Sequence, residues 1–422
     1  MTQQKTQNYV FPLIIMGVAF FVIGFAVGIN GIMVPILEGT FQLSKVVAYL
    51  VSSAFFLAAL VMGAPVGMLV KKIGYKKNMV TALFVMALGI LLFIPSAKLS
   101  TSMAGFYMFL IASFIGGIGQ TMLQASVNPY VTICGPIEKA AQRMCIMGIM
   151  NKSAWYLGPV FIGLFINLVN INITDVIFPF SLVAAIIAGL GVFIGFMRLP
   201  EIKAEGEETD SSAVETSSDP DIIAANQKTS IWQFPHLILG ALALFIYVGV
   251  ETLPMVSAID YAKTIGLENP AGYSGIVPVG LVAGYIISIF VLQVMKQTNA
   301  LVLFTVIALI ASLCLIFLPA KTSIYCLAGL GFSHSLMWGA IWALAITKLG
   351  KFTKSGSSLM VVAIGGGAIL PLIFAFLIDI LKDSTMGAVA ADYQHAYWIF
   401  VPCYLYILWY ALSGHKIGLK KA

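Results

Sequence analysis

Long, nearly unbroken runs of apolar residues cover most of this chain, and short polar breaks separate them. A helix that crosses a bilayer needs about 20 mostly apolar residues. The first half of the chain holds six runs of this kind, at 9–37, 46–70, 78–97, 102–133, 144–169 and 174–198. Six more follow at 235–259, 271–295, 299–319, 322–349, 355–381 and 393–413. Membrane β-strands would be shorter and alternating. The pattern therefore predicts an all-α integral membrane protein with twelve transmembrane helices in two six-helix bundles.

A polar segment separates the two sets of runs. Residues 201–230 hold eight of the chain's 17 acidic residues, and Ser and Thr fill much of the remainder. Such a composition cannot bury a core, so we expect a solvated linker without regular structure. The predicted domains are an N-terminal bundle at 1–198, an acidic cytoplasmic linker at 199–233 and a C-terminal bundle at 234–422. Two six-helix halves around a midplane site are common among secondary transporters.

Composition narrows the class of protein further. The chain is 60% hydrophobic and 9% charged, whereas a soluble domain carries about 25% charged residues. No basic run lies beside aromatic residues on a polar face, which argues against a nucleic-acid partner. The five cysteines have neither metal-ligand nor disulfide spacing, so we expect no metal and no cofactor. No loop carries a catalytic set, so an enzyme is not expected. The expected partners are the lipid bilayer and a small solute, and the expected state is a monomer.

Basic residues predict the orientation of the chain. If both termini and the linker are cytoplasmic, 17 of the 23 Lys and Arg residues lie in cytoplasmic segments and five in outer segments. Cytoplasmic loops normally carry this excess, and an odd number of spans in either half would scramble it. We therefore predict a multi-pass protein of a plasma membrane, the inner membrane of a bacterium, with both termini cytoplasmic.

Several stretches resemble a known family. The loop after the second run reads Gly67-Met-Leu-Val-Lys71-Lys72-Ile-Gly74-Tyr-Lys76-Lys77. It resembles the signature GxLaDrxGrkr of the major facilitator superfamily, with Lys71 where many members have Asp. Residues 119–159 and 335–371 are similar to the fucose/glucose–galactose permease family, nearest its glucose–galactose branch. They contain Leu123-Gln-Ala-Ser-Val-Asn-Pro-Tyr130 and Gly365-Gly-Gly-Ala-Ile-Leu-Pro371. Tyr247-Val-Gly-Val-Glu251 resembles the seventh-helix YVGAE of that family.

The resemblance implies the major facilitator fold and active import of a monosaccharide, a glucose- or galactose-like hexose, by alternating access. H+ or Na+ is the implied coupling ion. It also implies a cytoplasmic gate loop made of Gly67, Lys71, Lys72, Gly74, Lys76 and Lys77.

Two stretches depart from the family pattern. The first-helix acid often linked to proton coupling is Gly31 here, and an Asn, a Gln and a Ser of the fifth helix read Cys145, Gly148 and Lys152. An uncoupled sugar facilitator, a carrier of an anionic sugar and a non-transporting sugar sensor therefore stay open as alternatives.

Two charges lie deep inside predicted spans, Lys152 near the middle of the fifth and Glu251 in the outer half of the seventh. Charges at such depth are costly and mark function by default. We hypothesise that both face a central cavity and pair there. Lys152 could occupy the place of a coupling cation or itself carry a proton. The alternative is a structural pair that locks the two halves in one state.

The remaining candidate side chains are amides and aromatic groups on predicted spans. Gln120, Gln124 and Asn128 recur every fourth residue and so share one helix face. Amides donate and accept hydrogen bonds, which suits a hydroxyl-rich sugar, although they also join helices to one another. Aromatic faces stack on sugar rings, although they also pack or anchor in lipid. The predicted sugar-binding residues are Asn30, Gln120, Gln124, Asn128, Asn151, Trp155, Tyr247, His334 and Trp338.

Overall fold

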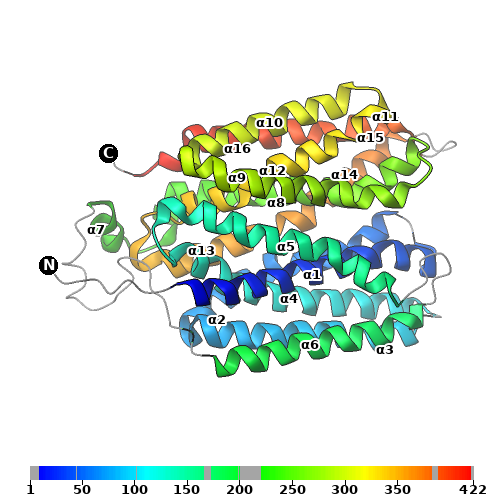
Figure 1. Cartoon of the computed structure of the whole chain (residues 1–422), viewed down its shortest axis with the longest axis horizontal. Helices are drawn as coiled ribbons and strands as arrows, with labels where there is room; N and C mark the ends of the chain where they lie inside the picture. Colours follow the sequence, from blue (N-terminus) through cyan, green and yellow to red (C-terminus); the bar gives the residue numbers. More distant parts are fainter. Residues whose placement is uncertain are drawn as a thin grey trace.

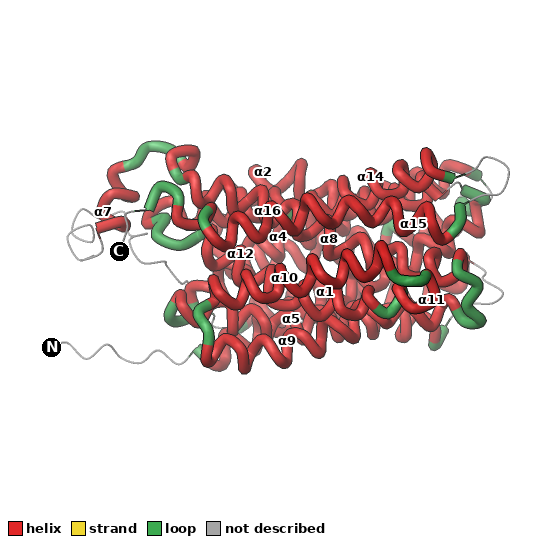
Figure 2. Tube along the Cα trace, turned by 90° about the horizontal axis from the view of Figure 1, so that it is seen from above, coloured by secondary structure: helices red, strands yellow, loops and turns green. Residues whose placement is uncertain are grey.

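The computed structural model describes residues 9–43, 45–100, 102–165, 173–197, 199, 220–382 and 388–419. Within these ranges the regular structure is helical throughout, without strands. The long helices run side by side along the long axis of the molecule, and the loops gather at its two ends (Figure 1 and Figure 2). The predicted all-α membrane fold is confirmed.

The N-terminal half contains one helix that is two spans in succession. Inside α2 the chain bends at Gly74, whose φ of 79° and ψ of 169° are not helical. Glycine has no Cβ and adopts this backbone conformation without strain. The elements of this half are α1 (Val10–Phe41), α2 (Lys45–Leu91), α3 (Phe93–Lys98), α4 (Met103–Ile133), η1 (Ile137–Lys139), α5 (Ala140–Gly163), η2 (Ile173–Val176) and α6 (Ile177–Phe196).

The C-terminal half builds several of its spans from consecutive segments. Helices α11 and α12 form one span, α13 and α14 another, and α15, η6 and α16 the last. Its elements are η3 (Ile231–Gln233), α8 (Pro235–Thr264), η4 (Pro270–Gly275), α9 (Ile276–Val294), α10 (Gln297–Phe317), α11 (Ala320–Ser323), α12 (Cys326–Ala345), η5 (Gly350–Phe352), α13 (Thr353–Ala363), α14 (Gly366–Leu381), α15 (Ala390–Ala396), η6 (Tyr397–Ile399), α16 (Phe400–Leu412) and η7 (Gly414–Lys416).

Ten helical stretches of the described residues are long and apolar enough to cross a membrane. One of them, Val47–Lys98, contains the bend at Gly74 and therefore counts as two spans. Helix α5 is absent from the ten because Asn151 and Lys152 lower its hydropathy. It nevertheless has 24 residues, about 36 Å at 1.5 Å per residue, and packs along α1 and α9. With these two additions the structure has the twelve predicted spans.

The two halves lie side by side, the N-terminal half (blue to green, ending with α6) below the C-terminal half (light green to red, from α8 to α16) (Figure 1). In the N-terminal half α1 packs on α5, and α2 packs on α4 and α6. In the C-terminal half α12 packs on α9 and α10, and α8 on α14. The halves meet where α2 contacts α13 and α14, and where α5 contacts α9 and α12. The start of α1 and the end of α16 lie at the same end of the molecule (Figure 1).

Part of the acidic linker is folded, which corrects the expectation of a wholly irregular segment. Residues Pro220–Gln227 form helix α7, which buries Ile222 and Ala225. Asp221 at its first turn forms an ion pair with Lys348, with 2.6 Å between Oδ2 and Nζ. Two apolar residues three apart share a helix face, and the basic loop before α13 supplies the partner that an isolated linker would lack. Residues 201–219 of the predicted linker lie outside the described residues.

Candidate functional site

A cavity of about 70 Å³ lies between the two halves. Its wall comes from the middle of the long helices, and both halves contribute to it. A space of this size holds several water molecules. The lining residues are Phe20, Ile23, Val27, Phe56, Gln120, Gln124, Met144, Gly148, Asn151, Lys152, Trp155, Val248, Glu251, Thr252, Tyr285, Trp338 and Ile364.

An ion pair between the halves forms one side of this cavity. Lys152 Nζ on α5 lies 3.2 Å from Glu251 Oε1 on α8. The two residues are only 6% and 7% exposed. Tyr247 donates its hydroxyl to the same carboxylate oxygen at 2.7 Å, and the Lys152 ammonium lies 4.3 Å from the ring centroid of Trp155. The charges compensate each other, so the cavity wall is polar but carries no net charge.

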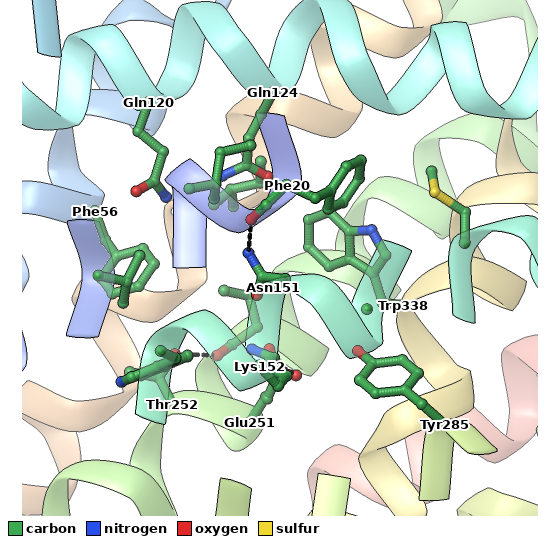
Figure 3. Close-up of a pocket in the computed structure, with 17 residues that line it drawn as sticks. Phe20, Phe56, Gln120, Gln124, Asn151, Lys152, Glu251, Thr252, Tyr285 and Trp338 are labelled. Carbon is green, nitrogen blue, oxygen red and sulfur yellow. Dashed lines mark hydrogen bonds and ion pairs between the residues drawn. The ribbon is translucent and has the colours of Figure 1, made fainter. Parts of the chain in front are cut away.

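Amides form the opposite side. Figure 3 shows Gln120 and Gln124 reaching from α4 toward the cavity, with Glu251 and Thr252 across from them. Gln124 Oε1 accepts a hydrogen bond from Asn128 at 3.4 Å. Gln120 Oε1 is buried and accepts no hydrogen bond from the described residues. This side of the cavity therefore offers donors and acceptors without charge.

Aromatic rings close the cavity laterally. Trp155 comes from α5 and Trp338 from α12, and Trp338 stacks on Trp342 with 5.7 Å between ring centroids. The indole nitrogen of Trp338 is buried and has no hydrogen-bond partner among the described residues. Tyr285 reaches in from α9 (Figure 3). The combination of apolar ring faces, amides and one compensated ion pair suits a small neutral polyhydroxylated molecule.

The structure brings most of the predicted site residues together. Gln120, Gln124, Asn151, Trp155 and Trp338 line the cavity, together with both deep charges. The Asn151 amide is already used in part, because Nδ2 donates to the backbone oxygen of Phe20 at 3.0 Å.

The other predicted site residues lie elsewhere. Asn30 lines a separate apolar pocket of about 20 Å³ inside the N-terminal half, where it donates to Ser113 Oγ at 2.6 Å. Asn128, Tyr247 and His334 lie behind the cavity wall. The Tyr247 hydroxyl oxygen also lies 3.0 Å from the backbone oxygen of His334, and His334 Nε2 lies 2.7 Å from the Tyr404 hydroxyl. These three residues support the wall and do not line the cavity.

Sequence reasoning missed most of the apolar and small lining residues. Phe20, Phe56 and Tyr285 stand in apolar runs, where no contrast distinguishes a cavity-facing ring from a lipid-facing one. Two signals were available: Gly148 departs from the family pattern, and Thr252 follows directly after a deep charge.

At one end of the cavity the predicted gate loop contacts the other half. Gly67 on α2 faces Ser358 on α13 so closely that a Cβ would collide with the serine side chain. Ser358 donates its hydroxyl to the backbone oxygen of Gly63 at 3.0 Å. Lys354 Nζ lies 5.4 Å from the ring centroid of Tyr75. Glycine is needed here because the two helix backbones approach without room for a side chain.

The lysines of the predicted gate loop point elsewhere. Lys71, Lys72 and Lys77 are exposed. Lys76 donates to the backbone oxygen of Gly195 at 2.9 Å, within its own half.

At the other end the halves also touch. Tyr49 near the start of α2 donates to the backbone oxygen of Val256 on α8 at 3.2 Å. Ser53, about one turn further along, donates to that of Ala368 on α14 at 3.2 Å. The cavity thus lies between two sets of contacts, one toward each end of the helices.

Comparisons with known proteins agree with the observed fold. A family model described as Major Facilitator Superfamily matches residues 16–372. A glucose/galactose transporter of Brucella abortus biovar 1 (strain 9-941) is 30% identical over 431 residues, covering 98% of this chain and 97% of the relative. An L-fucose-proton symporter of Escherichia coli (strain K12) is 26% identical, covering 89% and 88%. A crystal structure of the major facilitator transporter FucP in the outward conformation has a TM-score of 0.76 at 24% identity, covering 96% of this chain and 99% of that one.

Proposed function

The chain belongs to the major facilitator superfamily of membrane transporters, and we propose that it imports a monosaccharide, a glucose- or galactose-like hexose, across a plasma membrane. The observation that carries the proposal is the cavity between the halves, where amides and aromatic rings surround a small space. Amides and indole nitrogens match sugar hydroxyls, and ring faces match the C–H side of a pyranose. The relatives named as glucose/galactose transporters support the same solute class.

The contacts on either side of the cavity support a mechanism of alternating access. The gate-loop contact of Gly67 with Ser358 closes one end, and the Tyr49–Val256 hydrogen bond closes the other. Each set joins one half to the other, so a rocking motion of the halves can release one set while it keeps the second. A sugar held by α4 and α5 of the N-terminal half and by α8, α9 and α12 of the C-terminal half would couple the movement of one half to that of the other.

The end that carries the gate loop is the cytoplasmic end in this proposal. Lys71, Lys72 and Lys77 are exposed there, and basic residues gather on the cytoplasmic side of membrane proteins. The start of α1 and the end of α16 lie at this same end (Figure 1), which supports cytoplasmic termini. Both halves of the site come from one chain, so a monomer suffices for transport.

Coupling to H+ or Na+ would depend on Glu251. It is the carboxylate among the described lining residues of the cavity, and its partner in this state is Lys152. In a coupled carrier the incoming cation would compete with the Lys152 ammonium for this carboxylate. In the alternative, an uncoupled facilitator, Lys152 would hold the place of the cation permanently. An anionic sugar would instead compete with Glu251 for Lys152.

Uptake into proteoliposomes tests these proposals. Radiolabelled D-glucose, D-galactose and L-fucose are supplied with pH and Na+ gradients imposed separately. We expect accumulation above equilibrium of one of the first two sugars with one of the gradients. Equilibration without accumulation would identify a facilitator, and binding without uptake a sensor.

Two variants connect uptake to the cavity. Gln124→Ala should weaken uptake because it removes an amide that lines the cavity. The matched control is Gln227→Ala, which removes the same side chain from an exposed position at the end of α7. This control should transport like the unmodified protein. Absence of both uptake and binding for every hexose would contradict the proposed function.

A further inference from the structure

One tyrosine on the cavity wall crosses the interface between the halves. Tyr285 belongs to α9, and its ring packs against Gly148 on α5. A Cβ at position 148 would collide with Cε1 and Cζ of the ring and would lie 2.8 Å from Cδ1. Contacts under 3.0 Å force the neighbour to move. The ring can therefore hold this position only because residue 148 has no side chain.

The hydroxyl of Tyr285 is directed into the cavity (Figure 3). Among the described residues this hydroxyl takes part in no hydrogen bond, although the residue is only 4% exposed. Tyr247, the other tyrosine nearby, differs in this respect because its hydroxyl already donates to Glu251 and lies 3.0 Å from the backbone oxygen of His334. Because Tyr285 borders the cavity, its hydroxyl can bond there to water or to a solute hydroxyl that replaces the water.

The position of this hydroxyl complements that of the amides. Gln120 and Gln124 approach the cavity from α4, in the N-terminal half, and Tyr285 approaches from α9, in the C-terminal half (Figure 3). A phenol both donates and accepts a hydrogen bond and carries no charge. A hexose between the two walls could therefore bond to both halves at once.

We infer that Tyr285 is a specificity-determining residue of the sugar site, that its hydroxyl bonds to one particular hydroxyl of the solute, and that Gly148 is the position that admits its ring. The inference rests on the proposed function. A site built to hydrogen-bond a substrate hydroxyl rejects the analogue that lacks it, because the protein group is then left unpaired. Tyr285 thus selects a neutral polyol with a hydroxyl at one defined ring position.

The test pairs protein variants with deoxy sugars. Binding of the hexose that the unmodified protein takes up is measured in detergent, together with its monodeoxy analogues at each ring position. Tyr285→Phe keeps the ring and removes the hydroxyl, so the parent hexose should bind about twofold to tenfold more weakly, the range of one neutral hydrogen bond. One deoxy analogue should bind both proteins equally, because it lacks the partner hydroxyl.

Matched variants separate this role from a structural one. Tyr107→Phe on α4 alters a tyrosine that is 59% exposed and should leave every affinity unchanged. Gly148→Ala should displace the ring of Tyr285, which lowers the melting temperature and weakens hexose binding. Adding Tyr285→Ala to Gly148→Ala should relieve the collision and restore the melting temperature. The double variant should still fail to discriminate among deoxy sugars.

The outcomes distinguish the inference from the proposed function. If Tyr285→Phe weakens the parent and every deoxy analogue by one common factor, or weakens none, Tyr285 does not select a hydroxyl. In that case hexose transport itself would stand. If the unmodified protein binds no hexose at all, the proposed function fails and the inference fails with it.

Discussion

Replacement of Lys152 by Met should disrupt the closed arrangement of the halves, and replacement of its partner as well should largely restore it. The charges are 3.2 Å apart, which at an effective dielectric constant of 20 corresponds to roughly 5 kcal/mol of attraction. Desolvation of both groups offsets much of this, so the intact pair stabilises the closed state only modestly. A single replacement leaves Glu251 buried without its partner, which typically costs about 3–5 kcal/mol.

These energies predict a large difference between single and double variants. A cost of about 3 kcal/mol lowers the population of the closed state on the order of a hundredfold. In the double variant, Lys152→Met with Glu251→Gln, both charges are gone and the side-chain volumes are nearly kept. We expect its closed state to lie within about 1 kcal/mol of the original, because replacing a buried pair by neutral groups is often nearly neutral.

The population of the closed state can be measured through a native thiol on α5. Cys145 is 1% exposed and shares a face of α5 with Gly148, which meets Tyr285 of the other half. A membrane-permeant maleimide should therefore reach its thiol only when the halves separate. With the other four cysteines replaced by Ala, the Lys152→Met variant should label at least tenfold faster than the parent, and the double variant within about threefold of it. Equal labelling of the single and double variants would refute the reasoning, because the two charges would then be acting independently. Uptake and ion dependence that both stay unchanged in Lys152→Met would remove Lys152 from the mechanism.

Three further substitutions test the packing that surrounds the site. Gly24→Ala should destabilise the N-terminal half by about 1–3 kcal/mol, because its Cβ would collide with the α5 backbone. The control is Gly31→Ala, whose Cβ has open space. The melting temperatures of the two variants are measured in detergent, and equal values would contradict the packing. Gly67→Ala should push Ser358 away and open the gate-loop end of the cavity. A cysteine introduced at that end should then be labelled faster than in the parent protein. Asp221→Ala should release α7 at a cost of about 1 kcal/mol or less, seen as faster amide exchange over 220–227 while sugar affinity stays constant.

Burial cost explains which parts of the molecule were predictable. Twelve spans follow from the length of the apolar runs, because lipid forces every backbone group into a helix. Lys152 and Glu251 were detectable for the same reason, since a charge in an apolar run contrasts with its surroundings. Their contact at 3.2 Å could only be hypothesised, because helix rotation and tilt depend on packing between the halves.

Side chains that resemble their neighbours, or whose contacts lie far away in the sequence, could not be predicted. Tyr285 gives no contrast within its run, and its role depends on Gly148 in the other half, 137 positions earlier in the sequence. Asn30 matched the expected residue type, yet the rotation of α1 directs it to Ser113 inside its own bundle. Helix α7 was missed because its stability comes from the loop at Lys348, a contact that local composition does not encode.

The compensated charge of the cavity has an electrical consequence. Moving one elementary charge across the whole membrane potential changes the free energy by about 2.3 kcal/mol per 100 mV. Because the Lys152 ammonium and the Glu251 carboxylate lie together, they can shift through the field as a dipole of zero net charge. The return of the empty carrier should then proceed at the same rate at any membrane voltage, and a current during sugar uptake would belong entirely to the ion that travels with the sugar.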